Sequence, residues 1–234
     1  MDKYLKETKL LNYRSNEITT LIAERKWNTL NEFDKIGAIY DYVQNKILLG
    51  YNKYDNLTAT EVLADGIGQC NTKATLLMAL LRAVGIPCRL HGTMVTKVFQ
   101  RSLMPEIMAK LAPLLIVHTW AEVFYNGEWL SLEGAITDKA YISGLRKVFP
   151  EHKGKFFDYA VAVEDFQNLQ IEWDGGNTTV QQQAVVEDLG VFDTPDEFYS
   201  EYRQSYRCIK KFIYENIGRK IMTKKVAKIR KCHN

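Results

Sequence analysis

The chain has 234 residues, a formal net charge of +3 at pH 7 and 46% hydrophobic residues, which is typical of a globular protein with a sizeable core. No apolar run approaches the length of a membrane span, and the first residues lack the apolar stretch of a signal peptide, so the sequence predicts a cytoplasmic protein. The four cysteines are too few and too scattered for a disulfide framework or a zinc site, and they are Cys70, Cys88, Cys208 and Cys232.

The first third of the chain predicts mainly helices. Residues 3–25 have the mixed charge of a helix, and residues 31–49 predict a second helix. The apolar face of this second helix carries Phe33, Ile36, Ile39, Tyr40 and Val43. A loop follows, and Thr58 or Thr60 is expected to cap a short helix because a threonine side chain accepts a hydrogen bond from an unpaired N–H of the first turn.

Cys70 lies where a glycine-rich loop meets a strongly patterned helix. An apolar face follows at the spacing of one helix side, made by Ala74, Leu77, Met78 and Leu81. Gly85 and Pro87 are expected to end this helix. A thiol at a helix N-terminus is a candidate nucleophile, because the positive end of the dipole favours the thiolate and the free N–H groups can hold an oxyanion. The alternative is a small buried cysteine without chemistry.

Residues after this helix predict a strand and then an insert. The strand covers residues 88–95, and the insert covers residues 96–113 with a short helix near residues 105–111. Pro105 is expected at the first helical position, and Pro113 ends the helix. Apolar residues of the insert either line a substrate cleft or cover the sheet, and they are Phe99, Leu103, Met104, Ile107 and Met108.

Residues 117–134 predict a β-hairpin around the turn Asn126-Gly127, a pair typical of two-residue hairpin loops. With such a loop Tyr125 pairs with Glu128, Trp120 lies opposite Glu133, and His118 lies opposite Ala135. Alternation then places His118, Trp120, Ser131 and Glu133 on one face of the hairpin. His118 and Glu133 become diagonal neighbours, so a carboxylate can reach an imidazole.

A thiol, an imidazole and a carboxylate in this order have the roles of thiol chemistry on a carbonyl. The thiolate of Cys70 attacks, His118 carries the proton as general base and acid, and Glu133 fixes the imidazole tautomer. The N–H of Cys70 is the expected first oxyanion donor, and the candidates for the second are Gln69, Tyr51 and Tyr54.

The C-terminal part carries less information. One strand is expected within residues 156–166, a loop over 174–179, and a helix that starts in residues 194–202. Residues 203–234 hold eleven Lys and Arg and one acid, so they carry +10; since the whole chain carries +3, residues 1–202 carry −7. The basic segment is expected to dock on the acidic body as a helix, with Ile209, Ile213 and Ile217 inside. An anionic membrane surface or a nucleic acid are the alternative partners.

Several of these motifs together resemble the transglutaminase-like superfamily of papain-fold thiol enzymes. The stretches that carry the resemblance are Gly68-Gln69-Cys70, residues 80–89, His118-Thr119-Trp120-Ala121-Glu122-Val123, and Trp129 followed by Glu133. The resemblance covers about residues 33–138. It implies an α+β fold in which a helix carrying the cysteine packs on an antiparallel sheet carrying the histidine and the acid. We expect one domain over residues 1–202, in which the resemblance covers about residues 33–138, and a basic C-terminal helix or tail over residues 203–234.

The family acid is usually an aspartate, commonly followed by a proline, whereas this chain has Glu133 followed by Gly134. Asp138 is a rival acid, expected beyond the strand. The resemblance implies a Cys70–His118–Glu133 triad and a cysteine-dependent amide hydrolase acting through a thioester on a peptide, protein or other amide. The alternatives are acyl transfer to an amine, as in a transglutaminase, and a degenerate binding module. No cofactor or metal is expected, because no oxygen-ligand loop resembles a calcium site.

Overall fold

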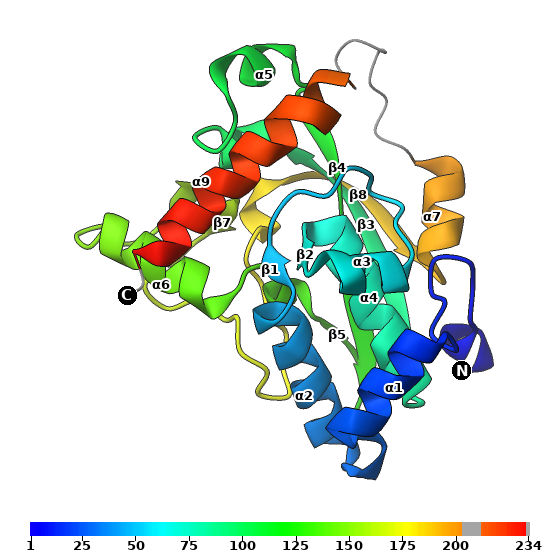
Figure 1. Cartoon of the computed structure of the whole chain (residues 1–234). Helices are drawn as coiled ribbons and strands as arrows, with labels where there is room; N and C mark the ends of the chain where they lie inside the picture. Colours follow the sequence, from blue (N-terminus) through cyan, green and yellow to red (C-terminus); the bar gives the residue numbers. More distant parts are fainter. Residues whose placement is uncertain (203–211, 233–234) are drawn as a thin grey trace.

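The computed structural model of this protein describes residues 1–202 and 212–232. It has an α+β architecture in which helices pack around a central antiparallel sheet (Figure 1). The helices are α1 (Asn16–Arg25), α2 (Glu32–Asn45), α3 (Ala59–Asp65), α4 (Cys70–Ala83), α5 (Glu106–Leu111), α6 (Lys139–Val148), α7 (Pro195–Glu201) and α9 (Arg219–Lys231). The strands are β1 (Leu48–Leu49), β2 (Ile67–Gly68), β3 (Cys88–Thr96), β4 (Leu115–Tyr125), β5 (Glu128–Ser131), β6 (Phe156–Asp158), β7 (Val161–Val163) and β8 (Val185–Phe192).

The main sheet has the strand order β5-β4-β3-β8, and every neighbouring pair is antiparallel. Two small sheets accompany it, a parallel pair of β1 and β2 and an antiparallel pair of β6 and β7. Short helical turns connect these elements, and they are η1 (Asp2–Leu5), η2 (Trp27–Thr29), η3 (Lys97–Gln100), η4 (Glu133–Ile136), η5 (Gln182–Ala184) and η6 (Tyr214–Gly218). The expected α+β class with an antiparallel sheet is therefore confirmed.

Helix α4 is the central helix of the fold. Its apolar face follows the predicted spacing, but twelve of its fourteen residues are buried, so neighbours surround it on all sides. It ends at Ala83, and Gly85 follows in the left-handed conformation at φ 82°, where a residue without a Cβ is favoured. The helix lies between α1, α2 and α3 and the main sheet (Figure 1).

Two hydrophobic cores meet near the start of α4. The first joins α1–α4 to the main sheet, and the second joins α5, α6, the β6–β7 pair and α9. Cys70 is half-buried and packs against the second core, although most of its helix belongs to the first. The thiol therefore sits at the seam between the two cores.

Two predictions for the helical first third need correction, and the choice between two capping threonines is resolved. Residues 3–25 form only η1 and α1; between them the N–H of Leu10 donates to Asp196 and is not available to a helix. Residues 31–49 end their helix at Asn45, and Phe33 is 39% exposed rather than buried on its apolar face. Thr58, not Thr60, caps α3, through a hydrogen bond from the N–H of Glu61.

The hairpin around Asn126-Gly127 is confirmed for its first four pairs, from Tyr125 with Glu128 to Glu122 with Ser131. The predicted pairs beyond Ser131 are wrong. The chain leaves the strand there and enters η4, which carries Glu133, so Trp120 and His118 have no cross-strand partner on β5.

Other elements after residue 88 largely follow the sequence predictions. Strand β3, helix α5 and helix α7 lie where they were expected, with Pro105 as the cap of α5 rather than its first helical residue. Residues 156–166 contain two short strands instead of one. Residues 174–179 form a loop that joins Leu132 through a single bridge at Thr178.

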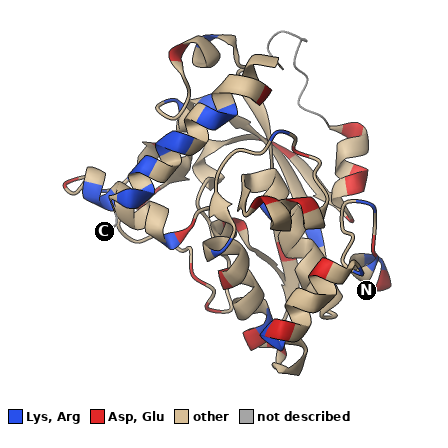
Figure 2. Cartoon of the chain, in the orientation of Figure 1, with Lys and Arg blue, Asp and Glu red and all other residues tan. Residues whose placement is uncertain are grey.

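Helix α9 packs across α6 and reaches toward α5 (Figure 1). Its buried residues are Met222, Val226 and Ile229. The predicted inner face is wrong at Ile217, which is 52% exposed, and Ile209 lies outside the described residues. Lysines and arginines follow the outer side of the helix (Figure 2).

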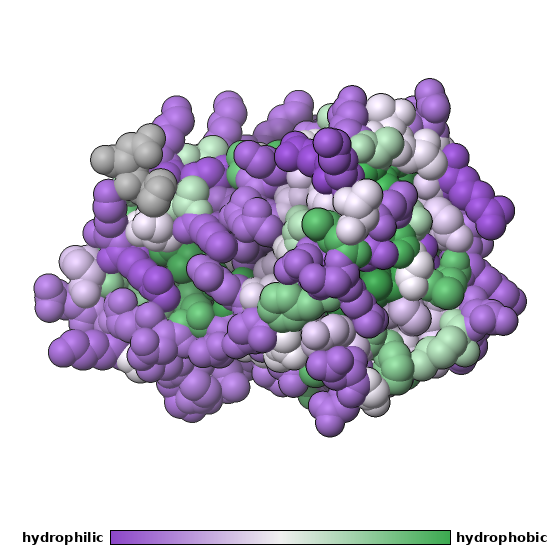
Figure 3. All heavy atoms as spheres, turned by 90° about the horizontal axis from the view of Figure 1, so that it is seen from below, coloured by the Kyte–Doolittle hydropathy of each residue, from purple (hydrophilic) through white to green (hydrophobic). Residues whose placement is uncertain are grey.

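The surface at the end formed by α1 and α2 is mostly hydrophilic, with small apolar areas between the charged groups (Figure 3). None of the described helices has both the length and the apolar character needed to cross a membrane.

Candidate active site

Cys70 is the first residue of α4, directly after Gly68 and Gln69. The N–H of Gln69 donates to Thr72 Oγ1 at 3.1 Å, which closes the first turn of the helix. A Cβ on Gly68 would lie 2.7 Å from Lys73 Cγ and 2.9 Å from Thr72 Oγ1, so only glycine lets the loop approach the helix this closely. The Gly-x-Cys spacing thus has a structural cause, and it places the thiol at the positive end of α4.

His118 is 1% exposed on β4 and faces both the thiol and the acid. Its Nε2 lies 3.0 Å from Glu133 Oε1. Its Nδ1 makes no hydrogen bond in the part of the chain that the structure describes. Burial by itself lowers the pKa of His118, but interactions with Cys70 and Glu133 outweigh burial and raise the pKa to about 10. The site therefore favours the protonated form of His118.

Glu133 reaches His118 from η4 rather than from a strand. It is 1% exposed, and its second oxygen, Oε2, accepts hydrogen bonds from the N–H groups of Val180 at 2.9 Å and Gln181 at 3.2 Å. The carboxylate is thus held at both oxygens. The extra methylene of glutamate relative to aspartate spans the distance between the turn and the imidazole.

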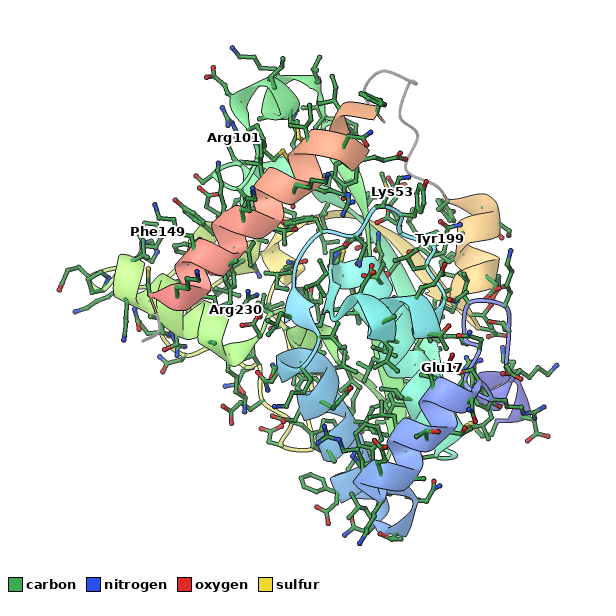
Figure 4. The ribbon with its side chains drawn as sticks, viewed as in Figure 1. Glu17, Lys53, Arg101, Phe149, Tyr199 and Arg230 are labelled. Atoms are coloured by element: carbon green, nitrogen blue, oxygen red, sulfur yellow. The ribbon has the colours of Figure 1, made fainter. Side chains whose placement is uncertain are left out.

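Asp138, the rival acid, lies away from the imidazole. It caps α6 by accepting from the N–H of Tyr141 at 2.9 Å, and it accepts from Arg230 at 2.7 Å. Arg230 lies in the last part of α9 (Figure 4). Burial raises the pKa of Asp138, but hydrogen bonds from Arg230 outweigh burial and hold the pKa below its ordinary value. As the sequence predicted, this acid lies beyond the hairpin.

Lys73 ties the helix of the thiol to the turn of the acid. Its ammonium is 1% exposed and donates to the carbonyls of Gln44 at 3.2 Å and Ile136 at 3.1 Å. Burial lowers the pKa of Lys73 to about 7. Because Ile136 belongs to η4, these bonds fix the position of Glu133 relative to Cys70.

Sequence reasoning missed Asn71, the residue after the thiol. Its Oδ1 accepts from Thr119 Oγ1 at 3.1 Å and lies 3.5 Å from Cys70 Sγ, while its Nδ2 donates to the carbonyl of Val117 at 3.4 Å. Its place in the first turn of α4 was the available signal. Asn71 joins α4 to β4 on both sides of His118.

The three candidates for the second oxyanion donor differ in position. Tyr51 and Gln69 line the same cavity as Cys70, whereas Tyr54 is not part of that lining and is 41% exposed. Tyr51 donates to Gln100 Oε1 at 2.9 Å, and Gln69 Nε2 donates to Asp55 Oδ1 at 2.9 Å. Tyr51 and Gln69 thus stand at the cavity wall, each with a protein partner.

A largely apolar cavity opens beside the thiol and the imidazole. Cys70 and His118 both line it, together with residues of the insert and of the C-terminal segment. Phe99, Met104 and Met108 of the insert belong to this lining. Of the two alternatives predicted for these residues, lining a cleft and covering the sheet, they therefore follow the first. Ile107 is 62% exposed and lies outside the lining. Within residues 1–202 and 212–232 no group of three or more His, Cys, Asp or Glu side chains is arranged to hold a metal ion.

A second histidine–carboxylate cluster lies on the same sheet. His91 Nδ1 lies 2.7 Å from Glu122 Oε1, and its Nε2 lies 2.9 Å from Asp188 Oδ1. Trp120 stacks on His91 with ring centroids 4.4 Å apart, and its centroid lies 5.5 Å from that of His118. Sequence reasoning missed this cluster because Asp188 comes from β8, far along the chain.

Comparison with known proteins identifies the family of the N-terminal half. Residues 19–134 match the family described as the Transglutaminase-like superfamily, a range that contains Cys70, His118 and Glu133. No curated protein matches the sequence. Among solved structures the chain is similar to a candidate cysteine protease from Cytophaga hutchinsonii, with 16% identity and a TM-score of 0.45. The similarity covers 83% of this chain and 47% of the other, so this chain spans about half the length of that protein.

Proposed function

Because this chain carries a domain of the transglutaminase-like superfamily, we propose that it is a cysteine-dependent amide hydrolase that acts through a thioester intermediate. One observation carries the proposal. His118 bonds to Glu133 through Nε2 at 3.0 Å and keeps Nδ1 free of other partners among the described residues, on the side of the Cys70 thiol. A thiol, an imidazole with one free nitrogen and a buried carboxylate are the groups that acyl transfer requires.

The proposed reaction has two steps. The thiolate of Cys70 attacks the amide carbonyl, and the imidazolium of His118 gives its Nδ1 proton to the leaving amine, which produces a thioester. His118, now neutral, takes a proton from water, whose oxygen attacks the thioester and releases the acid and the thiolate. The raised pKa of His118 suits its role as the proton donor in the first step.

Backbone and carboxylate groups assist both steps. The N–H of Cys70 at the start of α4 is the proposed first donor to the oxyanion, with Tyr51 or Gln69 as the second. Glu133 fixes the tautomer of His118 and balances its positive charge, while Val180 and Gln181 hold the carboxylate in place.

Acyl transfer to an amine shares every step up to the thioester, and a binding module without catalysis would keep the fold alone. The argument for a binding module without catalysis is that this chain has a glutamate where the family usually has an aspartate. The contacts of Glu133 weaken that argument, because the longer side chain bonds to His118 and to two backbone N–H groups at once.

Alkylation by iodoacetamide as a function of pH tests the activation of the thiol. Cys70 should label at about pH 6 at least tenfold faster than exposed Cys232, and His118→Ala should remove that advantage. Peptide mass spectrometry separates the labelled cysteines, Cys208 included. Equal labelling of Cys70 and Cys232 across the pH range would contradict the enzyme proposal.

Product analysis then separates hydrolysis from transfer. The protein is incubated with aminocoumarin amides and casein peptides, with and without an added primary amine. The products are identified by mass spectrometry. Free acids in both conditions support hydrolysis. New amides that replace the acids when amine is present would favour a transferase, and no turnover with an activated Cys70 would favour the binding module.

A further inference from the structure

We propose that the cavity beside Cys70 binds a hydrocarbon chain on the acyl side of the substrate, so that the preferred substrates are amides of aliphatic or similarly apolar acyl groups. This inference rests on the proposed function for its catalytic part. Its binding part depends only on the cavity and on the position of the thiol in its wall.

The lining of the cavity is mostly hydrocarbon and thioether. Its main apolar members are Phe99, Met104, Met108, Ile116, Ile213 and Met222. Most polar groups in the wall are paired with the protein: Tyr51 bonds to Gln100, and Gln181 Nε2 donates to the carbonyl of Ala160 at 2.7 Å. Gln181 Oε1 has no hydrogen-bond partner among the described residues. A polar or charged substituent would lose water without gaining enough partners, whereas a hydrocarbon chain would gain from leaving water.

The thiol stands in the wall of this cavity, and this decides which side of the substrate occupies it. After the attack the leaving amine departs, while the acyl group stays attached to Cys70 Sγ. An acyl chain bound in the cavity would therefore contact the apolar lining in the substrate and in the thioester. The three methionines add adaptable contact surface, because their unbranched thioether chains fit groups of different shape.

Helix α9 is held firmly as one wall of the cavity. A Cβ built on Gly218 would lie 1.7 Å from Met108 Sδ, so the glycine lets the chain before α9 sit directly on α5. Lys225 of α9 donates to the carbonyl of Ser102 at 2.8 Å. Gly144 permits a similar approach of α6, since its Cβ would lie 2.1 Å from the carbonyl oxygen of Ile229. The apolar wall is thus part of the packed structure.

Alkyl methanethiosulfonates of increasing chain length test the cavity without needing catalysis. The thiolate of Cys70 attacks the sulfenyl sulfur, forms a mixed disulfide and expels methanesulfinate, which leaves the alkyl chain attached at Sγ. On the wild-type chain the rate constant at Cys70 should rise from the methyl to the hexyl reagent by up to about fourfold per methylene buried. The rate constant at exposed Cys232 should not follow chain length.

Two variants and a matched control locate the effect. Ala112→Leu should fill part of the cavity and lower the preference for long chains by about tenfold, and Met108→Ala should extend it to longer chains. Ile107→Ala, on the same helix but exposed and outside the lining, should leave the chain-length series unchanged. If Met108→Ala fails to fold, Ala112→Leu still tests whether the cavity sets the preference for chain length.

Aminocoumarin amides of acetic, butanoic, hexanoic and octanoic acid provide the catalytic readout, and kcat/KM should rise with acyl length. A second series carries the same chains on the leaving amine and should show no such rise. A preference for chains only on the leaving amine overturns the acyl-side assignment.

The two proposals fail in different ways. A flat methanethiosulfonate series at Cys70, with iodoacetamide labelling still fast at about pH 6, overturns the cavity inference and leaves the hydrolase proposal standing. A steep series with slow labelling and no amide turnover overturns the hydrolase proposal and confines the cavity to binding.

Discussion

His91 and His118 lie on the neighbouring strands β3 and β4, and each bonds to a carboxylate, yet only one of them keeps a ring nitrogen available. Both ring nitrogens of His91 are hydrogen-bonded, one to Glu122 and one to Asp188, so this residue links β3 to β4 and β8. In His118 one ring nitrogen bonds to Glu133, and the other lies on the side of the Cys70 thiol. A histidine–carboxylate pair therefore does not by itself distinguish the two clusters; the proposed active site differs in having a second ring nitrogen on the side of the Cys70 thiol.

Burial separates the two clusters as well. The side chain of Asp188 is 65% exposed, whereas those of His118 and Glu133 are 1% and 2% exposed. Water and salt screen the pair of His91 with Asp188, so this pair contributes little to stability, whereas the side chains of His91 and Glu122 are only 19% and 11% exposed. The His118 pair lies in a poorly screened region, where charges act strongly on one another.

The largest contrast is expected for removal of each imidazole. His118→Ala should lower kcat/KM for an aminocoumarin amide by about 10,000-fold, because the proton donor and base is lost. His91→Ala should change it by less than about fivefold, since both nitrogens serve the sheet rather than the thiol. The fluorescence of released aminocoumarin measures the steady-state turnover of both variants, and circular dichroism checks that both are folded. Equal losses in two folded variants would end the distinction.

The acids should differ in the same direction. Glu133→Gln should lower kcat by about 100-fold to 10,000-fold, because an amide neither fixes the tautomer nor balances the imidazolium. Glu122→Gln is the matched control in the His91 cluster and should leave kcat within about fivefold.

The loss of kcat for Glu133→Asp should lie between the losses for Glu122→Gln and Glu133→Gln. Its shorter carboxylate cannot reach His118 and the N–H groups of Val180 and Gln181 at the same time. Full activity of Glu133→Asp would show that the reach of the glutamate is unimportant.

Stability should depend on pH through His118. The pKa of this group is raised from 6.5 to about 10 in the folded protein, so its contribution is fully present below about pH 6.5 and is lost as the pH rises through about 10. The free energy of unfolding of the wild type, minus that of His118→Ala, should therefore fall between these pH values in urea titrations. A difference that stays constant would contradict the anionic surroundings assigned to His118.

The free energy of unfolding of the wild type, minus that of His91→Ala, should also fall as the pH rises, but by less than the difference for His118→Ala. Burial lowers the pKa of His91, but hydrogen bonds to Glu122 and Asp188 outweigh it, so the pKa lies above its ordinary value. One of the two partners, Asp188, is 65% exposed, so water screens its interaction with His91, which reduces the pH dependence. A larger change for His91 than for His118 would reverse the comparison.

The smallest effect is expected at Trp120, which contacts both histidines. Its Nε1 is buried without a hydrogen-bond partner among residues 1–202 and 212–232, so Trp120→Phe loses ring area but no bond. The free energy of unfolding should change by less than about 2 kcal/mol and kcat/KM by less than about fivefold. Trp120→Leu, which removes the stacked ring, serves as the comparison. A loss near that of His118→Ala would mean that the indole positions the imidazole.

Local patterns in the sequence predicted much of the fold. The apolar spacing after Cys70, the glycine and proline at its end, and the Asn126-Gly127 turn each depend on neighbours along the chain, and the corresponding helix and hairpin are present. The family resemblance, stated for about residues 33–138, is confirmed over residues 19–134. Short-range preferences fail where distant contacts compete, as at Leu10, whose N–H donates to Asp196 instead of to a helical carbonyl.

The sequence by itself determined that a thiol opens a buried helix and that a histidine and an acid follow on the next elements. Only the tertiary structure decided how they meet. Hairpin pairing ends at Ser131, and Glu133 reaches His118 from a turn whose carboxylate is held by the distant backbone of Val180 and Gln181. The cavity wall from α9 and the pairing of His91 with Asp188 depend likewise on residues far apart in the chain. Such contacts form only when burial of two cores brings separate segments together, and no local spacing encodes them.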